Sequence, residues 1–169
     1  GERYRSGVAA EFAISVDRVR ALPNAIDNLI DATSPAGTAD ILLPSRLAND
    51  KVWLLDAAID LATTSSRPLR VVGSGLHADD WRARLEQSCP QPWTLTEIAD
   101  LGSHIAGADV VVAAGLVAME AAAAARRVVV PDKAGGWLGA VTTSAMGQMR
   151  ESNFAAWGST PITDASSVW

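Results

Sequence analysis

Two cationic side chains stand where they could bind a phosphorylated ligand. Arg46 and Lys51 lie in "PSRLANDK", directly after an apolar run that is typical of a buried strand. A guanidinium can hold phosphate oxygens bidentately, whereas an ammonium acts as a mobile point charge, so the pair suits a diphosphate. The alternative is that both are solvated loop charges.

Glu120 is the third candidate, in "GLVAMEAAAAARRVVVP". The alanines predict a helix that begins near Gly115 and runs straight into a valine-rich strand. The free N–H groups at a helix start can bind an anion, and a carboxylate one turn further on can accept hydrogen bonds from the two hydroxyls of a ribose. The alternative is that Glu120 only interacts with the helix dipole.

Glycines form a further candidate in "VGSG", which ends with Gly75. Gly73 could allow the backbone to approach a ligand closely, although a short Gly-x-Gly is common. The segment is not a complete G-x-G-x-x-G, which disfavours a dinucleotide cofactor. Near it, His77 with Asp79 and Asp80 could suggest a metal site, but acidic residues in a first helical turn are better explained by capping, so we expect no metal.

The elements that must position these residues alternate along the chain. Apolar runs predict strands, and apolar residues spaced by three and four predict the helices between them. The expected strands are 38–44, 68–73, 93–96, 109–113 and 127–131, and the expected helices are 50–64, 78–87, 98–105 and the one that carries Glu120. This order predicts an α/β fold with a doubly wound, mainly parallel Rossmann-like sheet and helices on both faces. Ligands bind such sheets beyond the carboxyl ends of the strands.

Composition restricts the function classes. The chain has 169 residues, 49% of them hydrophobic, which favours a single domain over 1–169. A net charge of −5 without a dense basic cluster argues against nucleic acid as a partner. The single Cys89 and two distant histidines exclude a Cys/His metal cluster. No run approaches the roughly 18 apolar residues of a transmembrane segment, and no signal peptide is visible, so we expect a cytoplasmic protein.

Five segments together resemble the carboxy-terminal domain of GT-B glycosyltransferases of the family-four-like kind. They are "LPNAID" (22–27), "SRLANDK" (45–51), "VVGSG" (71–75), "GADVVVAAGLVAMEAAAAARRVVVP" (107–131) and "ESNFAAWG" (151–158). The resemblance implies one half of a GT-B fold and a retaining, metal-independent hexosyl transfer from a UDP- or GDP-sugar, with the choice of base left open.

The resemblance also implies roles for particular residues. Arg46 and Lys51 would hold the donor diphosphate and stabilise its departure, and Glu120 would bind the ribose. The helix start, Gly115, Leu116 and Val117, would contact phosphate or sugar. The base would be recognised mainly by backbone near 93–96, where Thr94 and Thr96 are candidates.

Three departures accompany this likeness. Ala25 stands where the family has glycine, and Ser45 does so as well. Val112 stands where the family usually has a glutamate that contacts the donor sugar, inside the expected strand, which places sugar identity and activity in doubt. A non-catalytic nucleotide-binding or scaffold module, or a GT-B nucleotide-sugar epimerase, is therefore the alternative function.

The likeness also concerns the organisation of the whole protein. We expect the chain to be a fragment that lacks the amino-terminal acceptor-binding domain of such an enzyme and is inactive alone. For the full-length protein, peripheral attachment to the inner face of the membrane stays open.

Overall fold

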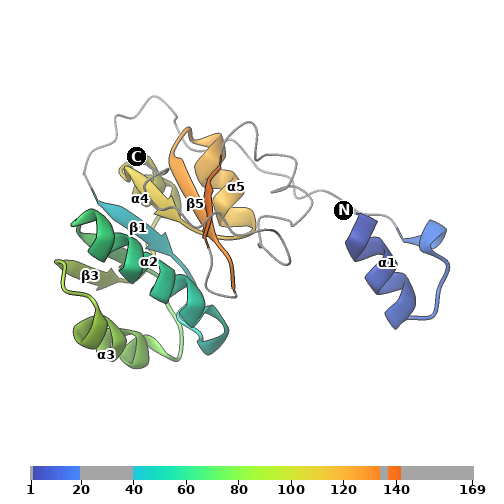
Figure 1. Cartoon of the computed structure of the whole chain (residues 1–169), viewed down its shortest axis with the longest axis horizontal. Helices are drawn as coiled ribbons and strands as arrows, with labels where there is room; N and C mark the ends of the chain where they lie inside the picture. Colours follow the sequence, from blue (N-terminus) through green and yellow to red (C-terminus); the bar gives the residue numbers. More distant parts are fainter. Residues whose placement is uncertain (1, 20–39, 134–136, 142–169) are drawn as a thin grey trace.

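The computed structural model describes residues 2–19, 40–133 and 137–141 (Figure 1). The helices are α1 (Glu2–Glu11), η1 (Val16–Arg18), η2 (Asn49–Lys51), α2 (Val52–Ser65), α3 (Ala78–Ser88), α4 (Leu101–Ala106) and α5 (Leu116–Ala123). The strands are β1 (Ile41–Pro44), β2 (Leu69–Val72), β3 (Trp93–Thr96), β4 (Val110–Val112), β5 (Arg127–Pro131) and β6 (Trp137–Ala140).

The described strands form one sheet in the order β3-β2-β1-β4-β5-β6. All neighbours from β3 to β5 pair in parallel, and only β6 is antiparallel to its neighbour. The chain moves outward from β1 to β3 and then returns to place β4 on the other side of β1. The strand order therefore reverses between β1 and β4, and the predicted doubly wound α/β fold is confirmed.

Both faces of the sheet are covered, which explains why the strands are almost continuously apolar. Along β1, Ile41 and Leu43 pack into a cluster with α2 and α3, whereas Leu42 packs on the opposite face with α4 and α5. Figure 1 shows these two helix pairs on either side of the sheet. Each fully buried leucine or isoleucine contributes about 1.5–3 kcal/mol through burial, so these clusters hold the strand ends in place.

The element boundaries correct two expectations. The helix expected from residue 98 begins at Leu101, because the Asp100 side chain accepts a hydrogen bond from Gly102 N and caps it there. The helix of Glu120 does not run straight into β5, because it ends at Ala123 and Ala125 has a positive φ of 54°. Sequence periodicity also missed α1 and β6. Residues 38 and 39 of the first expected strand lie outside the described part.

Ion pairs connect the strands at the amino edge of the sheet. Asp109, before β4, pairs with Arg67 and with Arg127. Asp40, before β1, accepts from Arg70 Nε at 2.8 Å. These polar groups neutralise one another next to the strand starts, and they have a structural role away from the carboxyl edge.

The segment before residue 20 forms its own local structure. Arg5 Nε donates to the carbonyl oxygen of Val19 at 2.8 Å and joins α1 to the end of η1. Of the helices that the structure describes, none has both the length and the apolar character needed to cross a membrane.

Candidate functional site

The carboxyl ends of β1 and β4 lie side by side at the point where the strand order reverses. Leu42 is level with Val111 in the parallel register. β1 ends at Pro44, two residues after Leu42, and β4 ends at Val112, one residue after Val111. The loop that carries Arg46 and the start of α5 at Gly115 therefore leave the sheet next to each other, where this class of fold binds its ligands.

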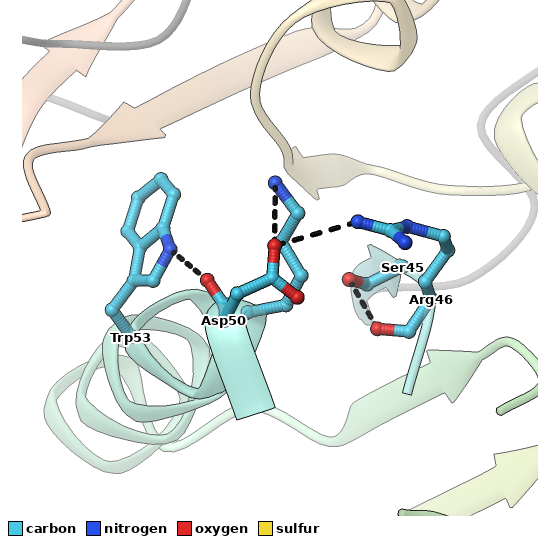
Figure 2. Close-up of polar contacts among 5 residues, drawn as sticks. Ser45, Arg46, Asp50 and Trp53 are labelled. Carbon is cyan, nitrogen blue, oxygen red and sulfur yellow. Dashed lines mark hydrogen bonds and ion pairs between the residues drawn. The ribbon is translucent and has the colours of Figure 1, made fainter. Parts of the chain in front are cut away.

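The loop between β1 and α2 is fixed by its own hydrogen bonds. Ala48 N donates to the Arg46 carbonyl, and Lys51 N donates to the Ala48 carbonyl, each at 3.0 Å. Trp53 Nε1 donates to the carbonyl of Asp50 at 2.9 Å, as Figure 2 shows. The Trp53 ring also packs against the core, so the loop is tied to the first turn of α2.

The neighbouring loop after β2 holds the Arg46 backbone from both sides. Ser45 N donates to Val72 O and Leu47 N donates to Ser74 O, each at 3.0 Å. A Cβ on Gly73 would overlap the Ser45 carbonyl oxygen, and one on Gly75 would overlap the Leu47 backbone. Because these two glycines have no side chain, the loop after β1 can lie directly against them. A contact of Gly73 with a ligand stays a prediction.

Asp50 lies close to Arg46 and Lys51, the two residues that are predicted to bind a diphosphate. Its Oδ2 accepts from Arg46 Nη2 at 3.4 Å and is 3.9 Å from Lys51 Nζ. The side chain of Arg46 is 73% exposed, that of Asp50 59% and that of Lys51 31%. Figure 2 shows the Arg46 and Asp50 side chains turned toward each other above the loop. The two cations are therefore close together and accessible.

The start of α5 provides the second part of the site. Gly115 has φ 63° and ψ −135° at the N-cap, a conformation that favours glycine, and as a glycine it has no side chain with which to cap the helix. Leu116 is 43% exposed, and Val117 is half-buried. The Glu120 side chain, one turn further on, is half-buried, and its carboxylate has no hydrogen-bond or ion-pair partner within residues 2–19, 40–133 and 137–141.

The end of β3 lies two strands away from β1. Trp93 and Leu95 face the core, so the alternation of the strand places the exposed Thr94 and Thr96 on its other side. Thr96 is the last residue of β3, and its carbonyl accepts from Gly73 N at 2.9 Å. Thr94 is level with Arg70, two residues before the carboxyl edge. Thr96 is thus the better placed of the two candidates.

The loop after β3 ends at the Asp100 cap of α4. The Ser103 hydroxyl donates to the Asp100 carboxylate and holds its pKa below the usual range, with further help from the backbone N–H groups of Ser103 and Gly102. The Asp100 carboxylate therefore serves as the cap of α4.

Other residues that were considered in the sequence lie outside this group of side chains. Val112 is fully buried in β4 and packs against the α2 side, as expected for a strand residue. His77 Nδ1 lies 2.9 Å from Asp80 Oδ2, one turn along α3. The described residues contain no group of three His, Cys, Asp or Glu side chains that could hold a metal ion. Segments 22–27 and 151–158 lie outside the described part of the chain.

Sequence reasoning missed two features of this site. Asp50 faces Arg46 and Lys51, but Arg46 lies in a non-helical loop, where spacing in the sequence does not show which side chains meet. The contact of Gly75 with Leu47 joins residues that are far apart in sequence, and no local pattern signals it.

The chain shares its fold with glycosyltransferase structures. The structure of the pneumococcal O-GlcNAc transferase GtfA in complex with UDP and GlcNAc aligns with 76% of this chain, at a TM-score of 0.59 and 21% identity. The structure of a mutant of S. aureus TarM, in complex with Fondaparinux, alpha-GlcNAc-glycerol and UDP, aligns with 76% at a TM-score of 0.63 and 17% identity. A further TarM structure aligns with 72% at 0.57 and 15%.

These likenesses define the class of fold. The chain is a Rossmann-like α/β domain of the kind that these transferases contain, and it spans 28% of the length of the first two structures and 27% of the third. No family model matches the sequence, and a search of curated proteins also finds no match.

Proposed function

We propose that this domain binds the nucleotide-diphosphate sugar of a glycosyltransferase. What supports the proposal is that Arg46 and Lys51 follow β1, that α5 follows β4, and that β1 and β4 are neighbouring parallel strands where the strand order reverses. The fold likeness to two transferases with bound UDP supports the same assignment.

In this proposal, three groups of residues bind different parts of the donor. Arg46 and Lys51 bind the diphosphate and stabilise the negative charge that develops as it departs, without a metal ion. The N–H groups from Gly115 to Val117 contact a phosphate or the sugar, and Glu120 accepts hydrogen bonds from the ribose hydroxyls. Thr96, Thr94 and Gly73 lie toward the base.

Transfer of the sugar would belong to a larger protein. Because the chain spans less than a third of the transferases that it resembles, we assign to it only the donor-binding half of a retaining hexosyltransferase. A further, acceptor-binding domain would complete the catalytic cleft.

Calorimetry on this chain tests the proposal. UDP and GDP are titrated beside uridine and guanosine in a buffer that contains a chelator. We expect one diphosphate to bind more tightly than its nucleoside by at least about tenfold, because charge-assisted contacts are worth about 1.5–3 kcal/mol. Equal affinity for diphosphate and nucleoside, or no binding of either at millimolar concentration, would contradict the proposal.

The buried position of Val112 favours a second candidate, a module that binds the nucleotide but has lost the sugar contact. Titration with UDP and with a UDP-hexose separates the two. An intact donor site should bind the UDP-hexose at least as tightly as UDP, whereas a nucleotide-only module should bind it more weakly.

A further inference from the structure

In the β1–α2 loop, the carboxylate of Asp50 lies next to Arg46 and Lys51, the two cations of the proposed site. Asp50 Oδ2 is 3.4 Å from Arg46 Nη2 and 3.9 Å from Lys51 Nζ, so one carboxylate oxygen faces both nitrogens. Among the described residues, Asp50 is the ion-pair partner that the structure gives to each of them. A phosphate bound to these two nitrogens would lie close to the Asp50 carboxylate.

Hydrogen bonds hold the backbone that carries these three side chains. The Asp50 carbonyl accepts from Trp53 Nε1, and the adjacent Lys51 N donates to the Ala48 carbonyl. The loop that carries Arg46 is also bonded on both sides to the loop after β2. All three charged side chains therefore extend from one fixed stretch of backbone.

The free energy of this contact is small enough for a ligand to overcome. Exposed ion pairs contribute about 0–1 kcal/mol each, whereas a charge-assisted contact to a phosphate is worth about 1.5–3 kcal/mol. A diphosphate carries more charge than one carboxylate and can displace it, but its binding is weakened by the repulsion that remains.

We propose that Asp50 is an internal competitor for the anion-binding site of Arg46 and Lys51, which lowers the affinity of the site for diphosphates and so determines how readily a diphosphate is released. The inference rests on the proposed function for the identity of the ligand, but the competition itself concerns any diphosphate group. Inorganic pyrophosphate is therefore a suitable probe.

The test is the variant Asp50→Asn, which keeps the shape and one acceptor oxygen but removes the charge. Pyrophosphate and UDP are titrated into the wild-type chain and the variant at about 0.15 M ionic strength, where the Debye length is about 8 Å. We expect the variant to bind both about three- to tenfold more tightly, because one repulsive charge within a few ångströms of the ligand is removed. The gain should shrink at 0.5 M salt, where screening is strong.

Asp60→Asn is the matched control. It makes the same change of charge on an exposed residue of α2, about 12 Å along the helix from Val52, at a separation where screening removes most of the interaction. We expect its pyrophosphate affinity to stay within about 1.5-fold of the wild-type value. Thermal unfolding of both variants shows that each is folded.

The outcomes distinguish the inference from the proposed function. Unchanged or weaker pyrophosphate binding by Asp50→Asn, or an equal gain in Asp60→Asn, overturns the competition. Tighter pyrophosphate binding by Asp50→Asn alone supports it. If UDP then binds no better than pyrophosphate to either protein, the nucleotide assignment fails while the competition stands.

Discussion

Gly75 lies directly against the backbone of Leu47. A Cβ built on Gly75 would be 2.9 Å from the Leu47 carbonyl carbon and 3.0 Å from its nitrogen, and would overlap the carbonyl oxygen. Leu47 N donates to Ser74 O, and His77 N donates to Leu47 O, so the two loops are bonded on both sides of this contact. The position of Arg46 at the sheet edge therefore depends on a glycine in another loop.

Gly75→Ala should consequently destabilise the protein. Backbone atoms rather than a flexible side chain meet the new methyl group, so one loop must move, and we expect the free energy of unfolding to fall by at least about 2 kcal/mol. Urea unfolding followed by circular dichroism measures the change.

Gly107→Ala provides the comparison. Gly107 has φ −85°, and a Cβ there would lie 3.5 Å from the Ser103 carbonyl oxygen, an ordinary contact. We expect a change of less than about 1 kcal/mol. If the two variants lost equal stability, the contact between the loops would not be the cause.

The parallel sheet was predictable because its signals are local. Runs such as Val110–Val112 are apolar on both faces, and a helical pattern between successive runs requires crossover connections. For that reason Arg46 and Gly115, which are distant in sequence, could be expected at one edge before their positions were known.

The remaining features depend on contacts between distant segments. The glycines of "VGSG" were interpreted as space for a ligand, but which atoms fill that space depends on how the loop at Leu47 folds. Strand β6 contains Gly139 at φ 78° and lacks the regular alternation of a strand, so it is recognisable only through its pairing with β5. Whether Asp50 faces Arg46 is likewise decided by the folded loop.

Arg46→Ala and Lys51→Ala should weaken the binding of a nucleoside diphosphate more than that of the nucleoside. Each substitution removes a charge-assisted contact to phosphate, worth about 1.5–3 kcal/mol, and leaves the base and ribose contacts in place. Paired titrations of each variant with UDP and uridine, or with GDP and guanosine, measure the difference. Equal weakening of both ligands would place these side chains away from the phosphates.

Asp100→Asn should change how stability depends on pH. Hydrogen bonds from Ser103 and Gly102 keep the pKa of Asp100 below its usual value in the folded protein. A carboxylate with a lowered folded pKa stabilises the fold above its unfolded pKa of about 3.9, and this contribution is lost as the pH falls toward the folded value.

The wild-type chain should therefore have the higher melting temperature at pH 7, although asparagine is itself a good N-cap. The difference should decrease below about pH 4. Melting temperatures of both proteins between pH 7 and 3 provide the measurement. A difference that stayed constant over this range would show that the charge of Asp100 does not stabilise α4.

Glu120→Gln separates ribose binding from a purely structural role. The carboxylate can accept from two hydroxyls, whereas the amide of glutamine offers one acceptor oxygen, so binding of the ribonucleotide should weaken by about 1–2 kcal/mol, or roughly 5- to 30-fold. A 2′,3′-dideoxy nucleotide has no hydroxyls to lose, and most of the difference should vanish for it. Calorimetry of both proteins with both nucleotides yields the coupling energy between side chain and hydroxyls. If Glu120 served only the helix dipole, the variant would melt slightly lower, and the two nucleotides would be affected equally.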